Sequence, residues 1–123
     1  MTSSEPILRK ATAADAQAFY GKPHPYTFIG YVAELDGEII GIAGVFFDGG
    51  KRVAFSDLKP EVRKYRKFMV KTLKILAELF DSLGVPVYAV ANQAEPTAPY
   101  LLIKLGFRPT GSFGPFGELM KRG

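Results

Sequence analysis

The chain has 123 residues, a net charge of +4 and no cysteine, and 47% of its residues are hydrophobic. This composition suits one domain spanning residues 1–123 and excludes disulfides, zinc–thiolate sites and cysteine nucleophiles, and a single histidine, His24, excludes a histidine-rich metal site. No apolar run approaches the ~18 residues of a membrane span and no signal-peptide pattern opens the chain, so we expect a cytoplasmic protein without a metal or a membrane partner.

The first half of the sequence predicts one short helix among four strands. Residues 13–20 form the helix, with Thr12 or Asp15 as its cap. The dipeptide Asp36-Gly37 is a strong signal for a two-residue hairpin turn. The strands are expected at residues 7–10, 29–35, 38–47 and 52–57. The third of these strands is apolar throughout, so we expect it to be buried on both faces.

A long amphipathic helix and a strand–helix–strand unit make up the second half. Pro60 suits a first helical turn, apolar residues then recur every three or four positions, and Gly84 ends this single helix over residues 60–83. A buried strand, a second main helix and two short closing strands follow at residues 85–91, 95–105 and 107–121. The order β-α-β-β-β-α-β-α-β-β predicts a mixed α/β (α+β) fold around a central sheet.

Positive charge gathers in one segment around the start of the long helix, where Glu61 is the only acid among Lys59, Arg63, Lys64, Arg66, Lys67, Lys71 and Lys74. Cations at a helix N-terminus oppose the helix dipole by ~0.3–1 kcal/mol each when exposed, so their presence there favours a bound anion. A solvated basic face is the alternative that needs no ligand. Nucleic acid is a further alternative, through phosphate contacts and stacking, but no nucleic-acid-binding motif accompanies the segment.

The segment over residues 92–107 resembles the end of GNAT-family N-acetyltransferases. The family pattern is a strand ending in Asn, a helix of the form A-x-x-L-Y-x-K-x-G-F, and a further strand. Leu102 stands where the family usually has a catalytic tyrosine, and the positions that match are Ala98, Leu101, Lys104, Gly106 and Phe107. The order of elements resembles the GNAT fold over essentially the whole chain.

This resemblance implies that acetyl-CoA lies where two parallel strands diverge, with its pyrophosphate at the N-terminus of the helix after the fourth strand. The family loop V-x-P-x-x-R-x-x-G-x-G falls on residues 58–68, where Arg66 and Phe68 replace both glycines. Basic side chains would then hold the phosphates in place of bare backbone. The resemblance implies cofactor contacts by Leu58, Arg63, Lys64, Tyr65, Arg66, Lys67, Phe68 and Asn92. Leu58 would offer its N–H to the acetyl carbonyl, and Asn92 would contact the pantetheine arm or serve as a plain turn residue.

Catalysis in the family needs a base for the amine and an acid for the leaving thiolate. Asp57 and Glu34 are candidate bases, with a helix cap and an exposed strand residue as their structural alternatives. Tyr100 is the candidate acid, although it lies on a different helix face from Leu102, and a core aromatic residue is its alternative reading. His24 lies in the loop where the family often forms its acceptor wall, and we assign it no catalytic role.

A narrower resemblance links the chain to small acetyltransferase-like proteins encoded by tailed phages. It depends on the short length, the lost glycines and the basic run at residues 64–68. Two functions follow as hypotheses. One is an N-acyltransferase that uses acetyl-CoA and an unknown amine acceptor. The other is a catalytically degenerate binding or assembly module, associated with phage virion proteins, which the residues Arg66, Phe68 and Leu102 favour.

Overall fold

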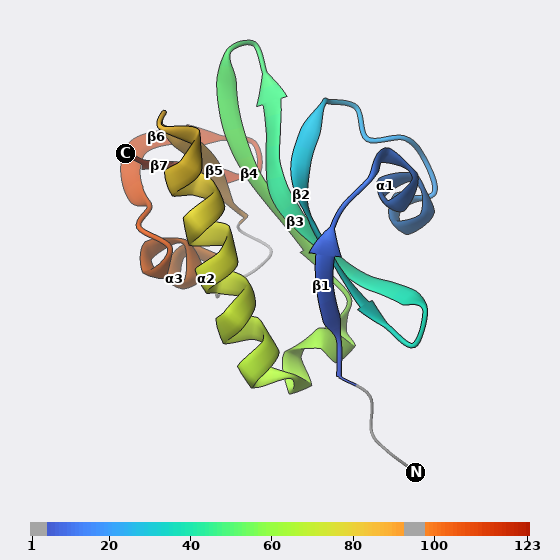
Figure 1. The fold of residues 1–123 in the computed structure, drawn as a ribbon. Coiled ribbons are helices and arrows are strands. Elements are labelled where there is room, and N and C mark those ends of the chain that lie inside the picture. Colours follow the sequence, from blue (N-terminus) through green and yellow to red (C-terminus); the bar gives the residue numbers. More distant parts are fainter. Residues whose placement is uncertain (1–4, 93–97) are drawn as a thin grey trace.

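The structure is a computed structural model that describes residues 5–92 and 98–123. A seven-stranded sheet carries helices on both faces (Figure 1). The elements in chain order are β1 (Ile7–Lys10), α1 (Ala13–Tyr20), β2 (Phe28–Leu35), β3 (Glu38–Asp48), β4 (Lys51–Leu58), the 3-10 helix η1 (Pro60–Lys64), α2 (Arg66–Leu83), β5 (Val87–Asn92), α3 (Ala98–Lys104), β6 (Arg108–Gly114) and β7 (Gly117–Arg122). The predicted mixed fold and the predicted order of strands and main helices are confirmed.

The strands follow the order β1-β2-β3-β4-β5-β7-β6 across the sheet. Neighbouring strands are antiparallel except β4 and β5, which are parallel. Such a parallel pair needs a crossover, and α2 supplies it. None of the helices in the described ranges combines the length and the apolar character needed to cross a membrane.

The hairpin of β2 and β3 forms as its sequence predicts. Asp36 and Gly37 both have positive φ, at 52° and 82°, as a two-residue type I′ turn requires. Residues 40–45 of β3 are all buried, which confirms the expected burial on both faces. The two strands approach so closely that a Cβ on Gly44 would lie 2.1 Å from the Ile29 carbonyl oxygen, so only glycine fits there.

The helices cover opposite faces of the sheet. Ala16 of α1 packs with Val32 and Ile42. The next residue of β3, Ala43, belongs instead to the main core cluster, which includes residues of α2 and is packed by residues of α3. Successive residues of a strand point to opposite faces, so α1 covers one face while α2 and α3 cover the other.

The prediction of one continuous helix over residues 60–83 is wrong in one respect. The observed helical segment is interrupted at Tyr65. Tyr65 has φ −100° and ψ 70°, outside the helical region, between η1 and α2. Val62 and Phe68 pack in the same cluster with Ala33 and Ile40 of the sheet. Six residues apart in a continuous α-helix, the two side chains would point about 120° apart. The break at Tyr65 allows both to reach the sheet.

The helix ends follow the sequence. Gly84 adopts the left-handed conformation and ends α2. At the end of α3, the Phe107 N–H donates to the Leu102 carbonyl and the Gly106 N–H to the Ile103 carbonyl, at 2.9 and 3.0 Å. Gly106 has φ 93° and Phe107 is fully buried, so this Schellman-type end turns the chain directly into β6.

Candidate functional site

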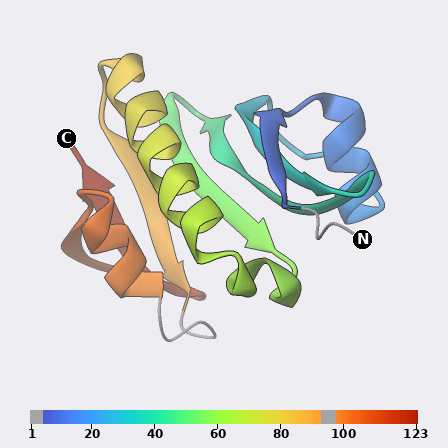
Figure 2. The same ribbon diagram turned by 60° about the horizontal axis from the view of Figure 1, so that its bottom comes forward.

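The sheet divides into two halves where β4 and β5 meet. Among residues 5–92 and 98–123, these parallel strands pair only at Arg52–Val87 and Val53–Tyr88. Beyond that point β4 stays with β3 as far as Leu58, and β5 stays with β7 as far as Asn92. The strands diverge toward their carboxyl ends, as Figure 2 shows. The facing backbone groups of the two strands are therefore not paired with each other there, and ligands of open α/β sheets bind at such ends.

The backbone N–H groups at the end of β4 point in directions that its pairing with β3 determines. The Lys59 N–H donates a 2.9 Å hydrogen bond to the Ile40 carbonyl of β3. Successive N–H groups of an extended chain point to opposite sides, so the N–H of Leu58 is directed away from β3, toward the side of β5. The Leu58 side chain is 40% exposed. Gly41 opposite leaves room for it, since a Cβ on Gly41 would lie 2.7 Å from Leu58 Cδ2.

The basic segment begins at the end of β4. Lys59 Nζ forms a 2.6 Å ion pair with Glu38 and so joins this point to the start of β3. Lys64 Nζ lies 5.6 Å from the centre of the Tyr65 ring. The first turn of α2 has no acidic residue and no side-chain cap. Exposed cationic side chains therefore surround a helix start whose N–H groups favour an anion, and they are Arg63, Lys64, Arg66 and Lys67.

Phe68 occupies a position where the family loop has glycine, and its side chain is directed toward the sheet. It packs against Ala33, Ile40 and the fully buried Val62. Arg66, at the other glycine position, is exposed. The loop therefore uses Phe68 as an anchor, and its basic side chains are distributed over the outer surface.

Asp57 lies near the carboxyl end of β4 and is exposed. Its carboxylate accepts a hydrogen bond from the hydroxyl group of Tyr20, at the end of α1. Burial, and then this hydrogen bond, raise the pKa of the Tyr20 phenol above its ordinary value. Tyr20 therefore keeps its proton at neutral pH and acts as a donor to Asp57. Tyr20 was not identified from the sequence. The signal that could have pointed to it is the high aromatic content of residues 19–28.

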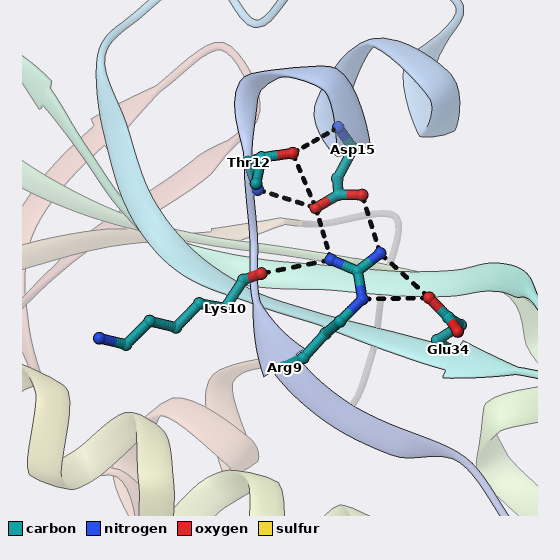
Figure 3. A network of polar contacts seen from close by, with 5 residues as sticks. All are labelled: Arg9, Lys10, Thr12, Asp15 and Glu34. Atoms are coloured by element: carbon teal, nitrogen blue, oxygen red, sulfur yellow. Dashed lines mark hydrogen bonds and ion pairs between the residues drawn. The ribbon is translucent and has the colours of Figure 1, made fainter.

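Glu34, the other candidate base, belongs to a network at the start of α1 (Figure 3). Arg9 Nε donates to Glu34 Oε1 at 3.0 Å, and the same guanidinium holds both carboxylate oxygens of Asp15 at 2.8 and 2.9 Å. Glu34 thus anchors Arg9, two strands away from β4. In residues 5–92 and 98–123, no three His, Asp or Glu side chains gather into a potential metal site.

The remaining predicted site residues lie at or beyond the end of β5. Asn92 ends β5, and Tyr100 lies in α3. The side chains of both lie outside the part of the chain that the structure describes. Leu102, which replaces the family tyrosine, is half-buried and packs against the main core cluster. Its position is therefore used for packing α3 onto the sheet.

No family model matches the sequence, and no curated protein matches it. Solved acetyltransferases match its structure. The ribosomal-protein-S18-alanine N-acetyltransferase of Escherichia coli is 13% identical with a TM-score of 0.68, over 96% of this chain and 93% of that chain. A GNAT-superfamily phosphinothricin acetyltransferase from Sinorhizobium meliloti, solved with AcCoA, is 20% identical with a TM-score of 0.68, over 95% and 87%. A GNAT-family acetyltransferase from Streptococcus pneumoniae is 18% identical with a TM-score of 0.66, over 96% and 98%.

The match spans nearly the whole of this chain and most of each of these proteins. It includes the mixed seven-stranded sheet and helices on both of its faces. The narrower resemblance to phage-encoded proteins stays a prediction. At these identities the likeness is one of fold, and the chain is a protein of the GNAT acetyltransferase fold.

Proposed function

We propose that the protein is an acetyl-CoA-dependent N-acyltransferase that transfers an acetyl group to a primary amine. The divergence of β4 and β5 after Val53 and Tyr88 is the observation that carries this proposal. Because of this divergence, the carboxyl ends of β4 and β5 are separated from each other. The basic start of α2 follows the end of β4. The solved acetyltransferase of this fold that was crystallised with AcCoA supports the choice of cosubstrate.

The phosphates of acetyl-CoA are assigned to the start of α2. Arg63, Lys64, Arg66 and Lys67 supply charge-assisted hydrogen bonds, with Tyr65 and Phe68 shaping the loop between them. The packing of Phe68 against the sheet supports this assignment, because its ring is turned toward the core. The N–H of Leu58 is assigned to the acetyl carbonyl oxygen, where it stabilises the charge that develops in the transition state. Asn92 is assigned to the pantetheine arm.

Asp57 is assigned as the base. The amine nitrogen attacks the thioester carbonyl carbon, the C–S bond breaks, and the ammonium proton passes to the Asp57 carboxylate. Tyr20 holds that carboxylate through its hydroxyl group. The thiolate of CoA leaves and takes a proton from water or from Tyr100. Leu102 has no proton to give, so the family's usual acid is absent at that position.

Release of free CoA tests this function. The chain has no cysteine, so a thiol-specific reagent reports only the thiol of CoA. We expect thiol release that requires the protein, acetyl-CoA and an amine together, with an acetylated amine found by mass spectrometry. The test panel contains arylalkylamines, polyamines and peptide N-termini. If the folded protein releases no thiol with any of these amines, the proposal is wrong.

A binding or assembly module is the function that we set aside. The solved structures that match are acetyltransferases by name, over nearly all of this chain. The enzyme proposal accounts for the basic surface near Pro60, because the phosphates of acetyl-CoA would bind there. No feature of the described residues calls for a virion partner in addition.

A further inference from the structure

Six aromatic side chains form a cluster on the face of the sheet that α1 covers, and we call it the His24 cluster. His24 stands at its centre. The imidazole centroid lies 4.9 to 6.3 Å from the centres of five other rings, which belong to Phe28, Phe55, Phe46, Tyr20 and Tyr26. Four segments thus converge on one imidazole: α1, the loop after it, the β2–β3 pair and β4.

The His24 cluster lies at the surface. Phe28, Phe46 and Phe55 come from neighbouring strands and are partly buried, whereas Tyr26 at the edge of the cluster is 41% exposed. Phe80 and Phe107 in the core of the protein are by contrast 3% and 0% exposed. The rings are tilted to the imidazole by 34° to 65°, so an aromatic surface that is partly open to solvent offers both faces and edges to a planar group. Tyr26 stacks on Phe46 at 4.8 Å.

A carboxylate lies beside the His24 cluster. Asp57 follows Phe55 by two residues on β4, so both side chains point to the same face, about 7 Å apart along the strand. The Tyr20 hydroxyl reaches Asp57 while the Tyr20 ring lies 6.2 Å from the imidazole. Tyr20 therefore connects the aromatic surface to the carboxylate, and the carboxylate lies on β4 beyond the point where β5 departs.

We propose that the His24 cluster and Asp57 together bind the acceptor, a primary amine joined by a short linker to an aromatic or similarly flat apolar group. The inference rests on the proposed function and names its substrate class. The ammonium group pairs with Asp57 at the end of β4, and the flat group packs against the exposed faces and edges of the rings around His24, with Tyr26 the most exposed of them. A polyamine needs further carboxylates for its other charges, and Glu34 is already paired with Arg9.

The single histidine makes this site directly observable. His24 is the only histidine of the chain, so its imidazole NMR signals need no assignment by mutation. We expect 2-phenylethylamine, added without acetyl-CoA, to shift these signals in a saturable way. Spermidine at equal ionic strength should leave them nearly unchanged, because it has no flat group. Asp57→Asn should weaken 2-phenylethylamine binding about tenfold, through the loss of a charged partner.

Two further variants separate the site from general effects. Phe55→Leu keeps an apolar side chain and should weaken binding, whereas Phe113→Ala, at a 70% exposed position on β6, should leave it unchanged. No saturable shift up to ~10 mM 2-phenylethylamine would overturn the inference. So would equal shifts by spermidine, or full affinity in Asp57→Asn. These results leave acetyl-CoA binding untouched, so the inference and the proposed function fail separately.

Discussion

Asp57 and Tyr20 form the central pair of side chains at the scale of single residues. The Tyr20 phenol, with its pKa raised by burial and by the bond to Asp57, stays protonated and donates. The exposed Asp57 carboxylate accepts this bond, and it lies near the carboxyl end of β4, where the proposed function places the amine. In the proposed function, Asp57 is accordingly the proton acceptor and Tyr20 is the residue that positions it.

Asp57→Asn should lower kcat/KM by about 10²- to 10⁴-fold, because the amide cannot take the proton of the amine. Tyr20→Phe should lower it by about tenfold and shift the pH profile of kcat/KM, because it removes a hydrogen bond from the base. The measurement is thiol release from acetyl-CoA. Asp48→Asn, at an exposed position of β3, is the control. Full activity in Asp57→Asn would assign the base to another residue, with Glu34 as the next to test.

Asp57 was predicted from the sequence as a candidate base, whereas Tyr20 was not identified, for a physical reason. A carboxylate at the end of a strand that precedes a helix is recognisable from local pattern alone. The contact between Tyr20 and Asp57 joins residues 37 positions apart, and it depends on how α1 packs on the sheet. Leu102 is a similar case. The sequence shows that the family tyrosine is replaced, but it does not show that the Leu102 side chain packs α3 onto the core.

The start of α2 is the feature that matters most at the scale of elements. Periodicity predicted a helix here because Val62, Tyr65 and Met69 keep a helical spacing. The break at Tyr65 follows from the need of Val62 and Phe68 to reach one cluster, which no local pattern encodes. As a result, Arg63 and Lys64 lie in the last turn of η1 and Arg66 and Lys67 in the first turn of α2, in place of one continuous helix face.

The double variant Arg63→Ala/Arg66→Ala should weaken acetyl-CoA binding about 10- to 100-fold, through the loss of charge-assisted contacts to phosphate. Lys71→Ala/Lys74→Ala removes the same charge from exposed positions about 7 to 12 Å further along α2, and should change affinity far less. Isothermal titration calorimetry measures both. Equal losses in the two double variants would indicate general charge attraction and contradict a defined phosphate site.

The cap of α1 gives a prediction for stability. The Arg9 guanidinium, through hydrogen bonds, lowers the pKa of the Asp15 carboxyl well below its ordinary range. Asp15 also completes a capping box with Thr12. Asp15→Asn should therefore cost about 1–2 kcal/mol of unfolding free energy at pH 7.

The pH dependence of that cost follows from the direction of the shift. A lowered folded-state pKa stabilises the protein above the unfolded pKa of about 3.9, and this contribution is lost as the pH falls toward the folded value. Urea unfolding should show a constant difference between wild type and Asp15→Asn from pH 7 to about pH 5, which shrinks below about pH 4. Glu78→Gln, at an exposed position of α2, is the control. A difference that stays constant into acid would show that the charge of Asp15 is not what stabilises α1.

The sheet as a whole consists of two halves whose facing strands, β4 and β5, pair at Arg52–Val87 and Val53–Tyr88. Hairpins and the crossover by α2 were predictable from turn residues, periodicity and element order, and so was the overall fold. The length of the β4–β5 pairing was not predictable from the sequence. It depends on the tertiary arrangement, in which β4 continues to pair with β3 and β5 continues to pair with β7. The divergence at Val53 and Tyr88 is nevertheless where the proposed function places the acyl-CoA.

Thermal unfolding with acetyl-CoA tests the central claim most directly. A ligand at about 100 times its dissociation constant stabilises the folded state by about 2.7 kcal/mol, which is a shift of several degrees for a protein of this size. We expect millimolar acetyl-CoA to raise the midpoint of wild type in this way and to raise it much less in Arg63→Ala/Arg66→Ala. An unchanged midpoint of wild type, together with no heat of binding in calorimetry, would contradict the account.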